Sequence, residues 1–241
     1  MLSNLPAYIP IAFGLITLST LLLFYGIVRQ SRVEAIRRQS TLILLGLIGW
    51  LFTQAFLTMN GVYSMAAATA GPPKLILFGI LPTVLTIVLL FATPAGRRFI
   101  DSLPLTTITY LHVLRIPVEL VLFWLFIHKA VPELMTFEGR NFDILSGISA
   151  PFVAYFGLTK GKLSRPLILL WNVVCLGLLL SIVRYALLSA PSPMQQFAFD
   201  QPNIAITHFP FSWLPTFVVP IVLFGHLVSI RQLIVKPSSD E

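Results

Sequence analysis

Three ionisable side chains share one apolar stretch of the chain. Residues 105–129 are long and apolar enough to cross a bilayer, yet their middle contains His112, Arg115 and Glu119. At about 100° per residue, the three side chains fall on one stripe of a helix. Because an ionisable group at membrane depth costs at least ~2.5 kcal/mol, this stripe should face a partner or a wet cavity. It predicts either a pocket for an anion, a proton or a small polar ligand, or a structural Arg115–Glu119 ion pair within the helix.

Two histidines suggest a second chemistry. By helix rise, His112 lies about 10 Å above one end of its stretch, and His226 lies about 8 Å above Arg231 in the last apolar stretch. At a shared depth the two side chains could hold a b-type haem or a metal ion between helices. That alternative stays open, but we predict no resident cofactor, because the four histidines are isolated from one another. A retinal Schiff base is excluded because the last stretch contains no lysine in its interior.

Composition indicates the class of protein. The chain has 241 residues, of which 56% are hydrophobic and only 10% charged. So few charges are unusual in a soluble domain, and repeated apolar runs of about 20 residues are typical of a helical membrane protein. We therefore predict one all-α, polytopic domain with the lipid bilayer as its main partner. The single cysteine, Cys175, excludes an intramolecular disulfide and a cysteine-rich metal site.

Seven apolar stretches are predicted to be transmembrane helices. Their approximate bounds are 8–28, 41–63, 74–93, 105–129, 142–158, 166–190 and 209–233. Taken in alternation, the connections on one side collect most of the basic residues, namely Arg29, Arg32, Arg37, Arg38, Arg97, Arg98, Lys160, Lys162, Arg165, Arg231 and Lys236. The positive-inside rule then predicts an external N-terminus and a cytoplasmic C-terminus in a cytoplasmic (inner or plasma) membrane. This placement accounts for the net charge of +7 through anionic lipid headgroups, so we expect no nucleic-acid partner.

Prolines interrupt four of the seven predicted helices. Each removes an intrahelical hydrogen bond and frees a carbonyl about four residues earlier; the five are Pro82, Pro117, Pro151, Pro215 and Pro220. Such carbonyls either line a cavity or find polar neighbours, and transporters use broken helices in this way. Neutral polar side chains that could line a cavity, or instead join two helices, are Gln54, Asn60 and Asn172. Ser146, Ala150 and Ala154 recur every fourth residue and predict a ridge that another helix approaches closely.

A polar connection predicts a folded external hairpin over residues 133–143. Its charged and amide side chains are Glu133, Glu138, Arg140, Asn141 and Asp143. Asn141 or Asp143 should cap the next helix, and a carboxylate of this loop should pair with Arg184. The hairpin is either a lid held by ion pairs or a binding surface for an external partner, as in a sensor or scaffold.

The leading interpretation is a non-enzymatic membrane protein that binds or translocates a small ligand or ion. Its site would be a proline-kinked polar cavity centred on residues 105–129. In this interpretation Arg115 attracts an anionic group, and Glu119 is its counter-ion or a proton acceptor. The two histidines shape the cytoplasmic half. A membrane redox or metal enzyme using His112 and His226 is the alternative from another class. The oligomeric state stays open.

Overall fold

The computed structural model describes residues 5–64 and 73–235, and within these ranges it contains helices and no strands. The α-helices are α1 (Tyr8–Arg29), α2 (Glu34–Met59), α3 (Leu81–Ala92), α4 (Pro94–Ser102), α5 (Leu105–Leu111), α6 (Arg115–Ile127), α7 (Ile144–Phe152), α8 (Arg165–Leu188) and α9 (Val219–Val235). Short π or 3-10 segments extend or join them: η2 (Ile76–Ile80), η3 (His112–Leu114), η4 (Glu133–Met135), η5 (Val153–Thr159), η6 (Ala205–Thr207) and η7 (Leu214–Val218). The prediction of an all-helical fold is confirmed for the described residues.

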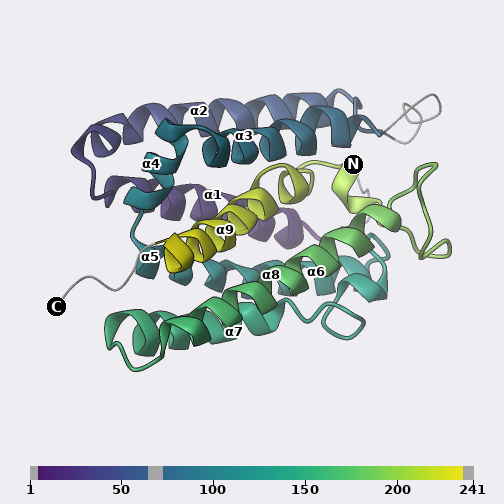
Figure 1. The fold of residues 1–241 in the computed structure, drawn as a ribbon. Helices are drawn as coiled ribbons and strands as arrows, with labels where there is room; N and C mark the ends of the chain where they lie inside the picture. The colour runs from purple at the N-terminus through teal and green to yellow at the C-terminus, as the bar shows by residue number, and fades with distance from the viewer. Residues whose placement is uncertain (1–4, 65–72, 236–241) are drawn as a thin grey trace.

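The helices are arranged in three layers (Figure 1). α2 and α3 lie along one edge, α1 and α9 occupy the middle, and α5–α8 form the opposite edge. α9 packs against α8, α5 and α3, and α1 packs against α2, α5 and α6. The two middle helices therefore join the outer layers. The start of α1 and the end of α9 lie at opposite ends of the bundle.

Five helical stretches are long and apolar enough to cross a membrane: Tyr8–Arg29, Glu34–Met59, Leu105–Ile127, Arg165–Leu188 and Leu214–Val235. A sixth results if Ile76–Ala92 and Pro94–Ser102, which meet at a bend of 92°, form one broken span. The remaining apolar helix, Ile144–Thr159, is about 24 Å long at the α-helical rise, shorter than the ~30 Å hydrocarbon core. The described residues thus contain five or six candidate spans by length and composition, and the predicted seventh stays a prediction.

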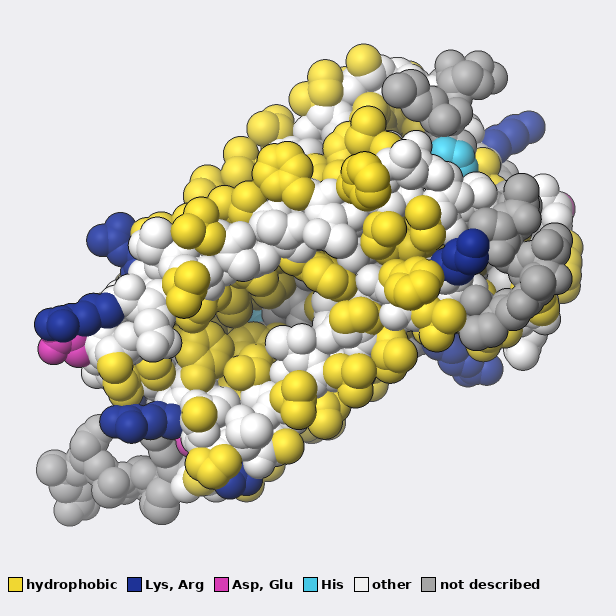
Figure 2. All heavy atoms as spheres, turned by 90° about the horizontal axis from the view of Figure 1, so that it is seen from above, with side chains coloured by type: hydrophobic (Ala, Val, Ile, Leu, Met, Phe, Trp, Pro, Cys, Tyr) yellow, Lys and Arg dark blue, Asp and Glu magenta, His cyan; other side chains and the backbone are white. Residues whose placement is uncertain are grey.

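The outer surface of the bundle is apolar along its length. Leu42, Phe52 and Phe56, all on α2, are 69%, 72% and 66% exposed. Figure 2 shows hydrophobic side chains over much of one face, with the basic side chains at the two ends. A soluble protein rarely exposes so large an apolar surface, whereas a bilayer would cover it. The surface therefore supports a membrane protein.

The basic connections predicted for one side of the membrane meet at one end of the bundle. The turn after α1 is bonded to α4 through the Arg32 N–H and the Ser102 carbonyl at 2.9 Å. Arg231 of α9 pairs with Asp101 of α4 at 2.9 Å. The Arg165 guanidinium at the start of α8 donates to a carbonyl near the end of α9. The grouping of these loops is confirmed, while the side of the membrane they face is not.

Two segments predicted as basic loops are largely helical. α2 begins at Glu34, earlier than predicted, and Glu34 pairs with Arg38 one turn later at 2.6 Å. The connection predicted around residues 97–98 is the helix α4, in which Thr93 caps the Gly96 N–H at 3.1 Å and Pro94 occupies the first turn. Thr93 followed by Pro94 is a sequence signal for the start of a helix, and a prediction from hydropathy alone does not use it. The last span also begins later than predicted, at η7 rather than near residue 209.

Each helix-breaking proline lies at or beside a departure from α-helical geometry. Pro82 comes just after η2, and Pro117 comes just after η3. Pro151 comes just before η5, Pro215 lies inside η7, and Pro220 comes just after η7. Because a proline cannot supply the backbone N–H of a regular turn, it favours local π or 3-10 geometry. The predicted interruption of these four helical stretches is confirmed.

Side chains of α2 satisfy two of the carbonyls that the prolines free. The Gln54 amide donates to the carbonyl of Phe78, four residues before Pro82, at 3.1 Å. The Trp50 indole donates to the carbonyl of Thr216, which another proline follows four residues later, at 2.9 Å. These two carbonyls therefore join helices and do not line an open polar channel.

Candidate functional site

The ionisable stripe of α5, η3 and α6 faces the interior. His112, Arg115 and Glu119 are only 0%, 3% and 2% exposed. The segment packs against α1 on one side and against α7, η5 and α9 on the others. The prediction that these groups face the interior of the bundle is confirmed.

Arg115 is paired with a residue of the external hairpin. Its Nε atom lies 3.2 Å from Oδ2 of Asp143, and both side chains are buried. Both carboxylate oxygens of Glu119 accept instead from the Asn141 amide, at 2.7 and 2.6 Å. Among the described residues no Arg115–Glu119 salt bridge forms, so that expectation is wrong. The hairpin satisfies both charges, and an Arg-before-Glu pair one turn apart has the less favourable orientation.

Asn141 fixes the hairpin against the stripe. Besides Glu119, its amide donates to the carbonyl of Met135 at 3.0 Å, and its side-chain oxygen accepts from the Asp143 N–H at 3.0 Å. Neither side chain caps α7, contrary to the prediction, because the Asp143 carboxylate is turned toward Arg115 and the Asn141 amide toward Glu119. Two regions that the sequence predicts separately, the stripe and the hairpin, thus form one cluster.

Small residues bring α7 close enough for this contact. Ser146, Ala150 and Ala154 are all fully buried, which confirms the predicted ridge. A Cβ atom on Gly147 would lie 2.9 Å from Cγ1 of Ile116, so only glycine fits there. The close approach places the start of α7 beside Arg115.

The two central histidines lie face to face. The rings of His112 and His226 stack with centroids 3.8 Å apart and planes 17° apart. Nδ1 of His226 lies 3.0 Å from Oδ1 of Asn172, which assigns the proton to that nitrogen because the amide oxygen only accepts. A Cβ on Gly225 would lie 3.3 Å from the His112 ring, so this glycine allows α9 to approach it. His112 and His226 therefore lie at one depth, as the sequence allows, and Asn172 forms a hydrogen bond between α8 and α9.

This histidine pair does not fit a haem. Rings stacked at 3.8 Å leave no space for a macrocycle or for an iron ion between their nitrogens. In the described ranges there is also no group of three or more His, Cys, Asp or Glu side chains arranged to hold a metal ion. Haem ligation here would require the two imidazoles to separate and turn.

Many polar atoms of this cluster lack a hydrogen-bond partner within the described part of the chain. They are both ring nitrogens of His112, the three guanidinium nitrogens of Arg115, Asp143 Oδ1, Ser146 Oγ, His226 Nε2 and Ser229 Oγ. A buried group left unpaired costs ~1–3 kcal/mol, so such atoms are rare in native interiors. Their concentration marks a place suited to a ligand or ordered water. We refer to the polar core, defined as His112, Arg115, Glu119, Asn141, Asp143, Ser146, Asn172, His226 and Ser229.

A side cavity of about 140 Å³ reaches this polar core. Glu119 and Asp143 line it, and its other walls are apolar side chains from η2, α3, α6, α8 and the last span. Val84 of α3 and Leu180 of α8 also line it and are 38% and 51% exposed. The side cavity therefore opens between α3 and α8, on the apolar outer surface of the bundle.

Two other predicted lining residues have local roles. Gln54 is fully buried and accepts from the Tyr63 hydroxyl at 2.6 Å, in addition to its bond to Phe78. Burial raises the pKa of Tyr63 to about 12, while the bond to Gln54 opposes part of that shift, so the phenol stays a donor. Asn60 is exposed and donates to the carbonyl of Phe56 at 2.8 Å. Asn60 therefore belongs to the end of α2 and not to the polar core.

The outer charges of the hairpin remain at the surface. Glu133, Glu138 and Arg140 are exposed, as is Arg184 on α8. In the described chain Arg184 has no carboxylate within ion-pair distance, so its expected pairing with the hairpin is not observed. The buried carboxylate of the hairpin, Asp143, is already paired with Arg115.

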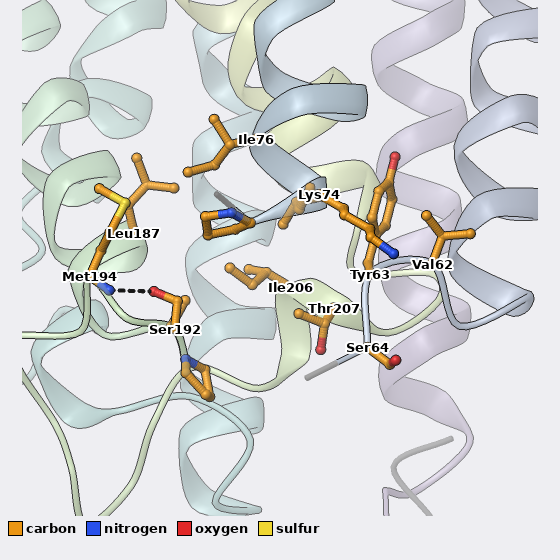
Figure 3. Close-up of a pocket in the computed structure, with 14 residues that line it drawn as sticks. Val62, Tyr63, Ser64, Lys74, Ile76, Leu187, Ser192, Met194, Ile206 and Thr207 are labelled. Carbon is orange, nitrogen blue, oxygen red and sulfur yellow. Dashed lines mark hydrogen bonds between the residues drawn. The ribbon is translucent and has the colours of Figure 1, made fainter. Parts of the chain in front are cut away.

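A smaller cavity lies at the end of the bundle opposite the basic connections. Figure 3 shows side chains from the turn after α2, the start of η2, the loop after α8 and η6 around it, with the Met194 N–H bonded to Ser192. Its volume is about 40 Å³. One water occupies ~30 Å³ of liquid, so this cavity suits a water molecule and not a larger ligand.

The roles of three residues in or beside the polar core were not predicted from the sequence, each for a different reason. Ser229 follows His226 by three residues on α9, a spacing that places both on one helix face and could have predicted its role. The small-residue spacing predicts only a packing role for Ser146, but its hydroxyl is buried beside the polar groups of the core. Trp171, whose ring lies 5.8 Å from both histidine rings, gives no sequence signal for this position.

Comparisons with known proteins bear on one part of the chain. A family model described as a domain of unknown function (DUF8737) matches residues 72–234, more than half of the sequence. No curated protein and no solved structure matches. The matched range contains every residue of the polar core and excludes α1 and α2.

Proposed function

The chain belongs to the DUF8737 family of unknown function, and from its own geometry we propose that it is an integral membrane protein that binds a small amphiphile in the side cavity. The observation that carries this proposal is an apolar cavity that ends at two buried carboxylates, Glu119 and Asp143. Lipid-soluble molecules could enter it from the side, between α3 and α8. The polar core would hold the head of the molecule.

The proposal includes seven spans with an external N-terminus. The broken pair formed by α3 and α4 and the short helix Ile144–Thr159 would complete the five long spans. The cluster of basic residues at one end supports a cytoplasmic position for that end, as the positive-inside rule predicts. The membrane would be the inner or plasma membrane.

The charges of the polar core favour a head group that donates hydrogen bonds. Arg115 is already paired with Asp143, which weakens the case for an anionic ligand. Oδ1 of Asp143 is buried without a hydrogen-bond partner among the described residues and can accept. The side cavity is lined by the carboxyl groups of Glu119 and Asp143 and not by the Arg115 guanidinium, which favours a hydroxyl or an ammonium over a carboxylate or phosphate.

The volume limits the part of the ligand that is enclosed. A cavity of ~150 Å³ lined by apolar side chains holds benzene, and the side cavity measures about 140 Å³. The enclosed part would therefore be about one six-membered ring with its head group. A longer apolar tail could extend between α3 and α8 into lipid.

A matched set of probes tests this proposal. Wild-type protein in nanodiscs is heated with 4-hexylphenol, 4-hexylbenzylamine, hexylbenzene or 4-hexylbenzoate, which share a ring and a tail and differ in the head. A ligand that binds only the folded state raises the melting temperature by mass action. We expect a rise with the phenol and the amine, and little change with hexylbenzene or the benzoate.

Pocket-filling variants provide the control. Val183→Trp places a large ring in the side cavity, whereas Val173→Trp adds the same ring on a half-exposed position of the same helix. Val183→Trp should abolish the rise, and Val173→Trp should retain it. An equal rise with hexylbenzene, or an unchanged response of Val183→Trp, would contradict the proposal.

A further inference from the structure

A second and larger hollow lies on the other side of α9. Its volume is about 430 Å³, and it is lined by side chains of α2, α3 and the last span, with Phe24 of α1 and Phe99 of α4 also in the lining. Figure 2 shows this hollow on the face formed by α2 and α3, with hydrophobic side chains around it. In the described chain α2 and α3 make few contacts with each other, so the hollow opens between them toward the outer surface. We refer to it as the α2–α3 groove.

The α2–α3 groove offers apolar contact and no free polar group that we can identify in its described lining. The Trp50 indole is bonded to the carbonyl of Thr216 at 2.9 Å. The hydroxyls of Thr83, Thr86 and Thr216 each donate to a backbone carbonyl three or four residues earlier in the chain. Because these groups already form hydrogen bonds within the protein, the groove suits a hydrocarbon chain and offers no hydrogen bond to a polar ligand.

Positive charge lies next to the part of the groove that Phe99 lines. Arg97 and Arg98 are exposed on α4, in the same turn as Phe99, which lines the groove. Arg37 is exposed on α2, about 9 Å along the helix from Ile43, the nearest lining residue of that helix. None of the three arginines forms an ion pair with a described residue. Within the described chain, therefore, no carboxylate neutralises these three guanidinium groups.

The depth of the groove matches one leaflet. Along α2 the lining runs from Ile43 to Trp50, about 10 Å at the helical rise. Together with the ~9 Å between Arg37 and Ile43, this distance is close to half of a ~30 Å hydrocarbon core plus the reach of an arginine. A molecule with its charge at the arginines would thus place an apolar chain along the whole groove.

We propose that the α2–α3 groove binds one acyl chain of an anionic phospholipid whose phosphate is held by Arg37, Arg97 and Arg98. The apolar lining selects the acyl chain of the lipid, and the three guanidinium groups select the charge of its head group. This site is separate from the side cavity, which lies across α9 and ends at carboxylates. A zwitterionic lipid, or a helix of a second protein, is the alternative occupant that the test must distinguish.

Native mass spectrometry of the full chain measures the preference directly. The protein is exchanged into detergent with equal amounts of phosphatidylglycerol and phosphatidylcholine of the same acyl chains. We expect retained phosphatidylglycerol to exceed phosphatidylcholine, and Arg97→Gln with Arg98→Gln to reduce that preference roughly fivefold for each charge lost. Equal retention of both lipids by the wild-type protein would overturn the proposal, as would a protein that retains only a second copy of itself.

A tryptophan swap separates the groove from the general lipid surface. Leu47 lines the groove, whereas Leu45 on the same helix is 58% exposed. Leu47→Trp should lose bound phosphatidylglycerol, and Leu45→Trp should retain it. Retention by both variants would contradict a site in the groove.

A second measurement needs no pocket-filling variant. Trp50 lines the groove, so brominated acyl chains bound there should quench its fluorescence, read as the difference between wild-type protein and Trp50→Phe. Quenching should be stronger with brominated phosphatidylglycerol than with brominated phosphatidylcholine at the same mole fraction in vesicles. Equal quenching by the two lipids would overturn the proposal.

Discussion

The two sides of α9 border interiors of opposite chemistry. Toward α5 and α8, His226 and Ser229 join a cluster of buried charges and amides. Toward α2 and α3, Ile221 and Phe224 line an apolar groove. Figure 1 shows why one helix serves both sides, since α9 lies in the middle layer between the two outer ones.

The comparison shows two solutions to polar groups in a membrane interior. Beside the groove, the carbonyls freed by prolines are bonded by Trp50 and Gln54, so that half of the bundle is satisfied without a ligand. In the polar core, Arg115 and Asp143 form an ion pair but leave atoms without hydrogen bonds. The first arrangement holds helices together, and the second leaves capacity for another molecule.

The largest expected effect comes from breaking the buried ion pair. Asp143→Asn leaves the guanidinium of Arg115 in the interior without its counter-charge, which should lower the free energy of unfolding by ~3–5 kcal/mol. Asp101→Asn serves as the control, because the Asp101–Arg231 pair is partly exposed. Unfolding in mixed micelles by a denaturing detergent measures both variants.

A double variant separates structure from binding at this pair. Arg115→Met with Asp143→Leu removes both charges, so most of the stability lost in Asp143→Asn should return. The same double variant should not bind 4-hexylphenol or 4-hexylbenzylamine, because the polar core has lost both side chains. If Asp143→Asn costs no more than Asp101→Asn, the polar core does not depend on this pair.

A smaller effect is expected where α2 meets η2. Gln54→Leu leaves the Phe78 carbonyl and the Tyr63 hydroxyl without their partner, at ~1–3 kcal/mol for a buried group. Asn60→Leu, on the same helix but exposed, should change the free energy of unfolding by no more than ~0.5 kcal/mol. Similar losses in the two variants would show that the bonds of Gln54 do not hold α2 in place.

The smallest effect is expected for a charge pair outside both interiors. Arg38→Gln breaks the exposed pair with Glu34 on α2. An exposed pair one turn apart contributes ~0.3–0.5 kcal/mol and weakens with salt. Thermal unfolding at low and high salt should show a small difference from wild type that disappears at high salt. A large loss of thermal stability at both salt concentrations would contradict a weak, solvent-exposed ion pair.

Features set by neighbours in sequence were predictable. Apolar length and the charge of the connections predict an all-helical membrane protein and the grouping of basic loops at one end. The inward orientation of Arg115 follows from the cost of charge in lipid. The prolines predict where helical geometry is interrupted, because each lacks its own N–H.

Features set by distant contacts were not predictable. Nothing in the sequence next to Asp143 indicates that its side chain pairs with Arg115, 28 positions earlier in the chain, and does not cap α7. The side cavity depends on α3 and α8 standing apart, and the stacked histidines depend on Gly225. The Arg115–Glu119 pair shows this most clearly. Its i,i+4 spacing allows an ion pair, but each side chain is bonded instead to a residue of the hairpin that is distant in sequence.

The most direct test of two different interiors uses one experiment on three proteins. Wild type, Val183→Trp and Leu47→Trp are each incubated with a mixture of 4-hexylphenol and phosphatidylglycerol, and native mass spectrometry records both adducts of each protein. We predict that Val183→Trp loses only the phenol and that Leu47→Trp loses only the lipid. Loss of both adducts in either variant, or of neither in both, would contradict the account.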